Sequence, residues 1–422
     1  MVALYRWLFA AGVLILLLGL LQKWFEQKWY LTEPLTAVAL GVALGPAGVQ
    51  LLGLPSAADS PRVLTQVTRV TLAVADMGVA LRLPRGYPVE HWRSLAVILG
   101  AGMVLMALVS GLLVWGLLGV SFWVAMLVGA TVTSTDPIVA TTIVTGPVAE
   151  KNIPARVRHF ISAESGANDG AVYPLVLLPI LMLTRPTGEA LTRWATYVVG
   201  WQVVGAVVLG AALGFSAARL FQWADLADIV EERGFVAYTL ALTFAVLGAA
   251  RLLSMDGILA SFVAGIAYRM APGTQQPSKE KNVQKAMTKF FVLPTFVLFG
   301  VAIPWGGWLT LGWRGILLAV LVLLLRRPPV VVALASGLAP LRTRKDVGFT
   351  AWFGPIGIST LFYVMFAVQR TGLRRIWPVV SLLVFASLLA HGLSATPLSR
   401  QMPPDTASER GRDRPQSSNP RG

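Results

Sequence analysis

Acidic residues lie inside segments of this chain that are otherwise apolar enough to cross a bilayer. Thr135, Asp136 and Pro137 fall in the middle of one segment, and Glu164 and Asp169 fall in the next. An ionised carboxylate at the centre of a bilayer costs about 2.5–3.5 kcal/mol on insertion scales, so it is a functional candidate by default. Carboxylates so placed can bind protons and small cations. These residue types therefore predict an ion pathway through a membrane.

The segment around Asp136 must break as a helix. The proline at position 137 disfavours helical geometry for the residue before it. Hydroxyl groups of Thr133, Ser134 and Thr135 surround that point. Broken backbone at membrane depth is tolerated only inside protein or beside water, and its carbonyl, hydroxyl and carboxylate oxygens suit a small hard cation. The plainer alternative is a proline kink in which Asp136 caps the following half-helix.

A second interruption lies at 353–359, where Gly354, Pro355 and Gly357 stand in an otherwise apolar span. The prolines of the two interruptions, Pro137 and Pro355, are 218 positions apart, about half of the chain. Interrupted spans at corresponding places in two halves are the best pointer in a sequence to a transport site built from inverted repeats. The second break therefore favours an ion-binding role for the first.

The segment after the first break presents its two carboxylates on different faces. Ser165 and Asp169 are four residues apart and share one face of a helix. Glu164 and Asn168 share the neighbouring face in the same way. Because Glu164 and Asp169 are five residues apart, they point about 140° away from each other. One carboxylate can then be paired while the other remains free to titrate.

Arg327 is the predicted partner of Glu164. It lies in mid-span, directly before two prolines, and a carboxylate buried in a membrane needs a partner. We predict a Glu164–Arg327 ion pair that acts as a structural clamp. We expect the neighbouring Arg326 to turn towards an interface or a cavity. Asp169 then remains as the acid for which a proton and a cation compete.

The composition predicts a helical membrane protein. Of 422 residues, 55% are hydrophobic and only 13% are charged, against about 25% charged in soluble domains. Apolar runs of spanning length recur along nearly the whole chain. With no cysteine and three scattered histidines, disulfides and thiolate metal sites are excluded and a zinc site has no support. The net charge of +15 fits basic loops that flank spans, rather than a partner nucleic acid.

The elements that position these residues are about thirteen transmembrane helices. We expect the ninth to be short, and Pro328 and Pro329 to kink the eleventh. Residues 1–398 form the predicted transmembrane domain, and the polar, Pro- and Ser-rich 399–422 a disordered cytoplasmic tail. The predicted spans are 7–21, 33–53, 63–81, 92–119, 121–146, 156–184, 193–222, 235–252, 257–270, 286–303, 308–341, 346–369 and 375–396.

Basic residues in the loops predict the orientation. With the N-terminus outside, the inside loops carry 18 Lys and Arg and the outside segments carry 8. Cytoplasmic loops are the ones enriched in Lys and Arg. We therefore expect a multi-pass protein of the inner (plasma) membrane, with its N-terminus outside and its C-terminus in the cytoplasm.

Five motifs along the chain together resemble a known family. They read T-D-P, E-S-x-x-N-D-G, R-P, F-G-P-x-G-I-S and H-G-L. In this order and spacing they resemble the monovalent cation:proton antiporter superfamily, specifically its electroneutral Na+/H+ exchanger branch, over roughly residues 10–398. The resemblance implies thirteen helices, a core domain and a dimerisation domain, a homodimer and an elevator-like alternation of access.

The resemblance also implies roles for the residues at matching positions. Asp169 is the carboxylate that binds both the cation and the proton, and thus the residue that holds the transported Na+. Glu164 and Arg327 match the ion pair of the core. The remaining positions are Thr135 and Asp136 in the first broken helix, Ser165 as an oxygen ligand, Asn168 as the mark of this branch, and Pro137, Gly354, Pro355 and Gly357 at the breaks.

Asn168 bears on the stoichiometry of exchange. The electrogenic branch carries Asp in its place, so this chain has a single titratable carboxylate in the motif. That carboxylate takes either one proton or one monovalent cation, which gives 1:1 exchange and moves no net charge. Two positions depart from the family. Ile356 stands where many relatives have a basic residue, so a pH response through that charge is not expected, and the sequence assigns no role to Asp256.

The predicted function is secondary active transport of Na+ or Li+ in exchange for H+, with no enzymatic activity and no cofactor. A K+/H+ antiporter of the same fold is a close alternative, because ligand types do not reveal the size of a site. A passive cation channel would need a continuous pore and no proton coupling. A membrane-embedded hydrolase would need a nucleophile or an acid dyad, and the G-x-G-D motif is absent.

Two more polar residues lie within predicted spans. Asp76 is interpreted as a structural hydrogen-bonding group, with a place in the ion path as the alternative. His391 is interpreted as packing against Gly392, with pH sensing as the alternative. The sequence leaves both alternatives open.

Overall fold

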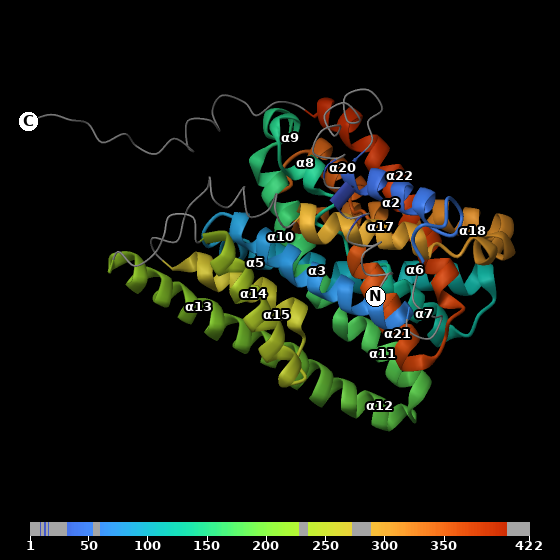
Figure 1. The fold of residues 1–422 in the computed structure, drawn as a ribbon, viewed down its shortest axis with the longest axis horizontal. Helices are drawn as coiled ribbons and strands as arrows, with labels where there is room; N and C mark the ends of the chain where they lie inside the picture. Colours follow the sequence, from blue (N-terminus) through green and yellow to red (C-terminus); the bar gives the residue numbers. More distant parts are fainter. Residues whose placement is uncertain are drawn as a thin grey trace, which may run out of the picture.

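A computed structural model describes residues 9, 12, 13, 16, 32–53, 60–227, 235–271 and 288–402. Every regular element in these ranges is a helix (Figure 1). The all-α class is therefore confirmed for this part of the chain. The predicted first span at 7–21, apart from four isolated residues, and positions 403–422 of the predicted tail lie outside the described residues.

Seven helices in the described ranges are long and apolar enough to cross a membrane. Several are composite, because a π-helical turn or a proline separates two α-helical parts. They are α3 (Ser60–Arg82); α5, η1 and α6 (Trp92–Ala96, Val97–Gly102, Met103–Leu118); α10 and α11 (Ala155–Ala171, Tyr173–Thr184); α12, η2 and α13 (Thr187–Arg193, Trp194–Val203, Val204–Leu226); α14 (Phe235–Leu252); α18, α19 and η4 (Trp305–Leu325, Pro328–Leu334, Ala335–Gly337); and α22 (Ile376–Arg400).

Shorter helices lie in the other predicted spans from 33–53 onwards and in two of the connections between spans. The full count of thirteen stays a prediction, because the first span is outside the described residues. The shorter helices are α2 (Glu33–Leu44), α4 (Tyr87–Glu90), α7 (Phe122–Thr131), α8 (Thr141–Val144), α9 (Pro147–Asn152), α15 (Gly257–Met270), η3 (Thr288–Val292), α17 (Leu293–Ala302), α20 (Arg344–Trp352) and α21 (Ile358–Thr371).

Both predicted helix breaks are present. Helix α7 ends at Thr131, and the chain is not helical again until α8 begins at Thr141. Helix α20 ends at Trp352, and α21 begins at Ile358. The predicted kink of the eleventh span also occurs, because α18 ends at Leu325 and a new helix starts at Pro328. Proline is tolerated there since the first helical residue needs no intrahelical donor.

Two predicted spans have different bounds in the structure. The span 33–53 is helical only to Leu44, because Gly45 and Pro46 follow and proline does not continue a helix. The span 193–222 is longer than predicted, since α12, η2 and α13 form one run from Thr187 to Leu226. Helix α22 ends at Arg400, and the Ser399 hydroxyl in its last turn donates to the Ala395 carbonyl at 2.6 Å.

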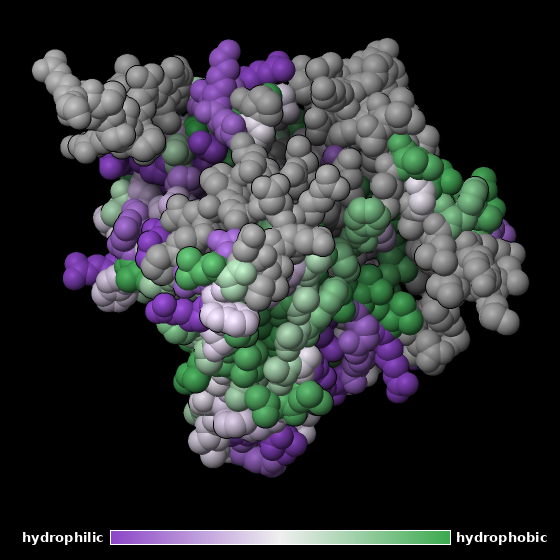
Figure 2. All heavy atoms as spheres, turned by 60° about the vertical axis from the view of Figure 1, so that its left-hand side comes forward, coloured by the Kyte–Doolittle hydropathy of each residue, from purple (hydrophilic) through white to green (hydrophobic). Residues whose placement is uncertain are grey.

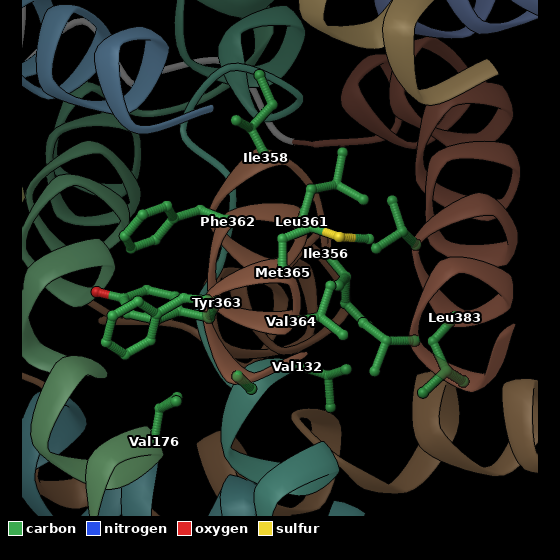
Figure 3. Close-up of a cluster of buried hydrophobic side chains, with 14 of the residues drawn as sticks. Val132, Val176, Ile356, Ile358, Leu361, Phe362, Tyr363, Val364, Met365 and Leu383 are labelled. Atoms are coloured by element: carbon green, nitrogen blue, oxygen red, sulfur yellow. The ribbon is translucent and has the colours of Figure 1, made fainter. Parts of the chain in front are cut away.

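Small residues let the central helices approach closely. A Cβ atom added at Gly214 of α13 would lie 2.2 Å from the carbonyl oxygen of Ala264 in α15, so these two backbones touch, as is common between membrane helices. Helix α21 lies inside a sheath of apolar side chains that includes Val132, Val176 and Leu383 (Figure 3). The half-helix that follows the second break is therefore held in the interior.

The outer surface matches a membrane-embedded chain. Large apolar side chains such as Val208, Leu309 and Trp313 are exposed on α13 and α18. On the face in Figure 2, apolar residues gather in the lower centre and on the right, and hydrophilic residues lie mostly towards the edges, with one patch right of the lower centre. Exposed apolar area of this extent is typical of contact with lipid rather than water.

Candidate ion-binding site

The two broken segments meet at Asp136. Its backbone N–H donates to the Pro355 carbonyl at 2.7 Å. Its carboxylate accepts from Ile138 at 2.7 Å and Val139 at 3.2 Å through Oδ1, and from Ile358 at 2.6 Å through Oδ2. Asp136 therefore caps both its own segment and the half-helix α21. This is the capping geometry of the plainer interpretation, extended across two segments 222 positions apart in the chain.

Glycine at position 357 makes this meeting possible. A Cβ atom added there would lie 1.9 Å from Oδ2 of Asp136. A larger residue at position 357 would therefore push the two segments apart. The two glycines of the second break thus have different partners, because a Cβ at Gly354 would lie 2.0 Å from Cδ of Arg327. Each glycine leaves room for one buried charged side chain.

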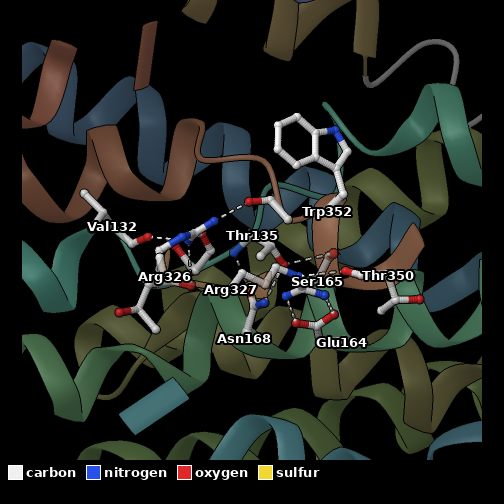
Figure 4. A network of polar contacts seen from close by, with 12 residues as sticks. Val132, Thr135, Glu164, Ser165, Asn168, Arg326, Arg327, Thr350 and Trp352 are labelled. Carbon is white, nitrogen blue, oxygen red and sulfur yellow. Dashed lines mark hydrogen bonds and ion pairs between the residues drawn. The ribbon is translucent and has the colours of Figure 1, made fainter. Parts of the chain in front are cut away.

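The expectation that Arg326 turns to an interface or a cavity is wrong. Its side chain is 2% exposed, and its guanidinium donates to the carbonyls of Val132 at 2.5 Å, Thr133 at 3.2 Å and Gly354 (Figure 4). Breaking a helix frees carbonyl groups that need donors inside a membrane. Arg326 supplies donors to both breaks, which is why it points into the protein.

Arg327 and Glu164 lie face to face in the interior, as the sequence predicts for them. Nη1 and Nη2 of Arg327 donate to Oε1 and Oε2 of Glu164 at 2.5 and 2.7 Å (Figure 4). The two side chains are 2% and 1% exposed. Nε of Arg327 also donates to the Thr350 carbonyl in α20 at 3.0 Å. The pair therefore joins α10 to the helix that precedes the second break.

Asn168 fastens the first break to α10. Its Oδ1 accepts from the Thr135 N–H at 3.2 Å, and its Nδ2 donates to the Thr135 hydroxyl at 2.6 Å. That hydroxyl lies 3.2 Å from the hydroxyl of Ser165. The structure thus brings together Thr135, Ser165 and Asn168 from two segments. Two hydroxyl oxygens then lie next to each other at the level of the break.

Asp169 lacks hydrogen-bond donors in the described part of the chain, in contrast to Asp136 and Glu164. Its carboxyl is fully buried, and no described residue makes a hydrogen bond to either oxygen. The groups that face it are the hydroxyl of Ser359 and the carboxyl of Asp76. Its backbone carbonyl accepts from the Tyr363 hydroxyl at 2.5 Å. A carboxyl without donors is open to a proton or a cation.

Ser359 and Tyr363 were not predicted as part of the site, and Asp76 was given a place in the ion path only as the alternative interpretation. Ser359 follows the second break and contacts the Ser134 hydroxyl of the first at 2.6 Å, and Tyr363 lies one turn further along α21. Asp76 carried a signal in the sequence, as an acid inside a span, but nothing in the sequence indicated that it faces Asp169. The partner of each is distant in the chain, so local pattern gives no indication of the contact.

Two other polar residues have clear structural places. Asp256 begins α15 and accepts from the N–H groups of Ile258 and Leu259 at 3.0 and 3.4 Å, which assigns it the role of a helix cap. His391 is a residue of α22, and its side chain faces the end of α20 at the second break. Its Nδ1 is 3.0 Å from the Ser387 hydroxyl, and its Nε2 is 3.0 Å from the Trp352 carbonyl.

Comparisons with known proteins show which proteins the chain resembles. The family model described as "Sodium/hydrogen exchanger, transmembrane" matches residues 12–401. The chain is 28% identical to a Na(+)/H(+) antiporter of Saccharomyces cerevisiae over 91% of its length, and to one of Schizosaccharomyces pombe over 92%. It covers 42% of the first relative and 88% of the second, and about half the length of the other curated relatives that match most strongly.

A solved structure shares the fold. The sodium proton antiporter MjNhaP1 from Methanocaldococcus jannaschii superposes with a TM-score of 0.72 at 20% sequence identity. The alignment covers 95% of this chain and 99% of that one. At this identity the likeness is one of architecture, and it extends over nearly all of both chains.

Proposed function

Because the chain belongs to the family of transmembrane sodium/hydrogen exchangers, we propose that it exchanges Na+ or Li+ for H+ across a membrane by competition of the two ions for Asp169. The observation that carries this proposal is the Asp169 carboxyl, which is buried and has no donor among the described residues. Hydroxyl groups of Ser359, Ser165 and Thr135 lie in the same region. All of these groups present oxygen, which suits a hard monovalent cation.

The balance of buried charge couples the two fluxes. At the two breaks, Arg326 and Arg327 carry two positive charges and Glu164 and Asp136 carry two negative ones, and all four side chains are buried, so these four charges cancel. An empty, ionised Asp169 adds a negative charge that is costly to carry through the barrier. One proton or one Na+ removes that charge. Exchange is then 1:1 and electroneutral, and the empty site does not cross.

The finer features of the protein follow from the family and from the charge of the loops. We propose a homodimer in which a core domain carrying both breaks moves past a dimerisation domain, in an elevator-type alternation. The excess of Lys and Arg on one side supports insertion into the plasma membrane with the N-terminus outside and the C-terminus in the cytoplasm. The role requires no enzymatic step and no resident cofactor.

K+ remains the alternative cation, and a passive channel the alternative mechanism. The relatives described above are named Na+/H+ antiporters, which favours Na+ over K+. A channel needs a continuous pore. It is disfavoured because both carboxyl oxygens of Asp169 are buried, so an ion bound there would occupy a closed site. Ion-dependent exchange in vesicles distinguishes these cases.

The proposal is tested with purified protein in liposomes that carry a pH gradient. Addition of Na+ or Li+ should collapse the gradient, K+ should do so weakly, and clamping the membrane potential should not change the rate. Asp169→Asn should abolish the response. Asp225→Asn, on an exposed residue near the end of α13, serves as the matched control and should behave as wild type. Full activity of Asp169→Asn would overturn the site assignment, and a folded wild type that responds to none of the three cations would overturn the function.

A further inference from the structure

Helix α22 presents a row of polar side chains to the second break. Ser387, His391 and Ser394 are spaced four and three residues apart, so they share one face of the helix. Ser387 and His391 are both buried. Buried polar side chains need hydrogen-bond partners, and these two find theirs outside their own helix as well as within it.

The backbone of the break supplies those partners. The Ile356 N–H donates to the Ser387 hydroxyl at 2.7 Å. Nε2 of His391 is 3.0 Å from the carbonyl of Trp352, the last residue of α20. The Trp352 indole N–H also donates to the Ser394 hydroxyl at 2.9 Å. Helix α22 therefore bonds to backbone groups on both sides of Pro355.

Arg326, Arg327 and Asp136 bond to four more backbone groups around this break. They are the carbonyls of Thr350, Gly354 and Pro355 and the N–H of Ile358. Broken backbone at membrane depth needs such partners inside the protein. The second break is thus held by charged residues and, from α22, by the uncharged side chains of the row.

The contacts of His391 assign the hydrogen on its ring. Nε2 faces a carbonyl oxygen, which can only accept, so Nε2 carries the hydrogen. Nδ1 then accepts from the Ser387 hydroxyl at 3.0 Å, while the oxygen of that hydroxyl accepts from Ile356. Nδ1 also lies 2.9 Å from the Ser387 carbonyl. A hydrogen on Nδ1 alone would leave Nε2 and the Trp352 carbonyl as two facing acceptors.

His391 is uncharged in this arrangement. The charged groups that act on it are Arg326 and Arg327, and both are buried cations. A further positive charge beside them is unfavourable where the dielectric constant is low. A neutral imidazole also donates through one nitrogen and accepts through the other. The contacts to Trp352 and Ser387 need these two roles.

We propose that His391 is a positioning residue for exchange, which acts on the second break through Ser387 as a neutral donor and acceptor. The Ser387–His391 relay runs from the Ile356 N–H through both side chains to the Trp352 carbonyl. It fixes the two sides of the break against each other. Ile358 lies two residues beyond Ile356 and bonds to Asp136, so the relay sets where the two breaks meet. This inference rests on the exchange proposed above.

The test compares His391→Gln, His391→Leu and Ser387→Ala with wild type in the liposome assay, over a range of pH and Na+ concentration. Glutamine keeps a donor and an acceptor, so His391→Gln should stay within about threefold of wild type, with an unshifted pH profile. His391→Leu removes both and should raise KM for Na+ about tenfold or more, with a smaller change in kcat. Ser387→Ala should raise KM about threefold or more. Ser399→Ala, whose hydroxyl bonds back to α22 itself, is the control and should match wild type.

A double variant tests whether the two side chains act as one relay. Residues in one hydrogen-bond network have effects that do not add. Ser387→Ala combined with His391→Leu should therefore have a KM within about twofold of that of His391→Leu alone. A KM raised by the product of the two single effects would show that the side chains act separately, and would overturn the relay.

The other contrary results are equally distinct. A shifted or flattened pH profile in His391→Gln would show that the imidazole titrates during exchange, and would overturn its neutral role. Wild-type KM values in Ser387→Ala, or in folded His391→Leu, would show that the row contributes only to packing. Should His391→Leu not fold, Ser387→Ala and His391→Gln decide. In each case an active wild type and an inactive Asp169→Asn leave the proposed exchange standing.

Discussion

Glu164 and Arg327 show what one buried pair contributes at the scale of single residues. Both side chains are almost completely buried and joined through two hydrogen bonds. The desolvation cost of such a pair offsets much of its attraction, so the intact pair is a weak source of stability, whereas the loss of one member leaves an unpaired charge. We infer that its main effect is to fix α10 against the second break.

Removing one member of that pair should be more damaging than replacing both. Glu164→Gln should lower stability by roughly 3–5 kcal/mol, because it leaves Arg327 without its counterion. The double variant Glu164→Leu with Arg327→Met should lose less. Thermal unfolding in detergent, followed by tryptophan fluorescence, measures both. Glu189→Gln breaks the exposed pair with Arg185 and should change Tm little. A double variant less stable than the single one would contradict this account.

The glycine at 357 gives a second prediction for a single residue. Gly357→Ala places a methyl group against the Asp136 carboxylate, so it should cost about 1–3 kcal/mol or more and reduce exchange severely. Gly348→Ala, in α20, meets no neighbouring atom within 4 Å and should be neutral or slightly stabilising, because alanine favours a helix over glycine. Stability and exchange of the two variants are compared directly. Normal exchange by Gly357→Ala would show that the segments do not meet as described.

At the scale of elements, the two helix breaks form the site, and Arg326 connects them through hydrogen bonds to carbonyls of both. Its donors reach carbonyls on either side of the crossing, at Val132 and Gly354. Lysine keeps the charge but lacks the planar set of donors that spans two acceptors. Arg326→Lys should therefore fold but exchange at least about tenfold more slowly. Arg314→Lys on α18, where the arginine lies near the Trp313 ring, is the control. Equal rates for the two variants would contradict the bridging role.

The sequence predicts where the helices break better than it predicts which residues contact each other across the fold. Pro137 and the Gly354–Pro355 pair locate both breaks, because proline and glycine act on their own backbone. Arg327 could be paired with Glu164, since a buried carboxylate requires a cation. Arg326 was placed wrongly because its partners are backbone carbonyls, which no side-chain pattern reveals. The position of Asp76 beside Asp169 depends on how α3 packs against α10, and hydrophobic periodicity does not determine that packing.

For the whole molecule, the orientation in the membrane is open to a simple test because the chain contains no cysteine. Gly188→Cys and Lys345→Cys place single thiols on exposed positions of loops predicted to lie outside and inside. A membrane-impermeant maleimide should label the first in intact cells and the second only after permeabilisation, while the wild type stays unlabelled. Labelling in the reverse order would contradict the N-out orientation.

The account of exchange depends on the number of protons that Na+ displaces from the buried core. Calorimetric titration of the purified protein with Na+, in buffers of different ionisation enthalpy, measures that number at the acid end of the activity profile. We predict one proton released per Na+ bound in wild type, and no Na+ binding by Asp169→Asn. Release of two protons, or binding of Na+ without release, would contradict competition for a single site at Asp169.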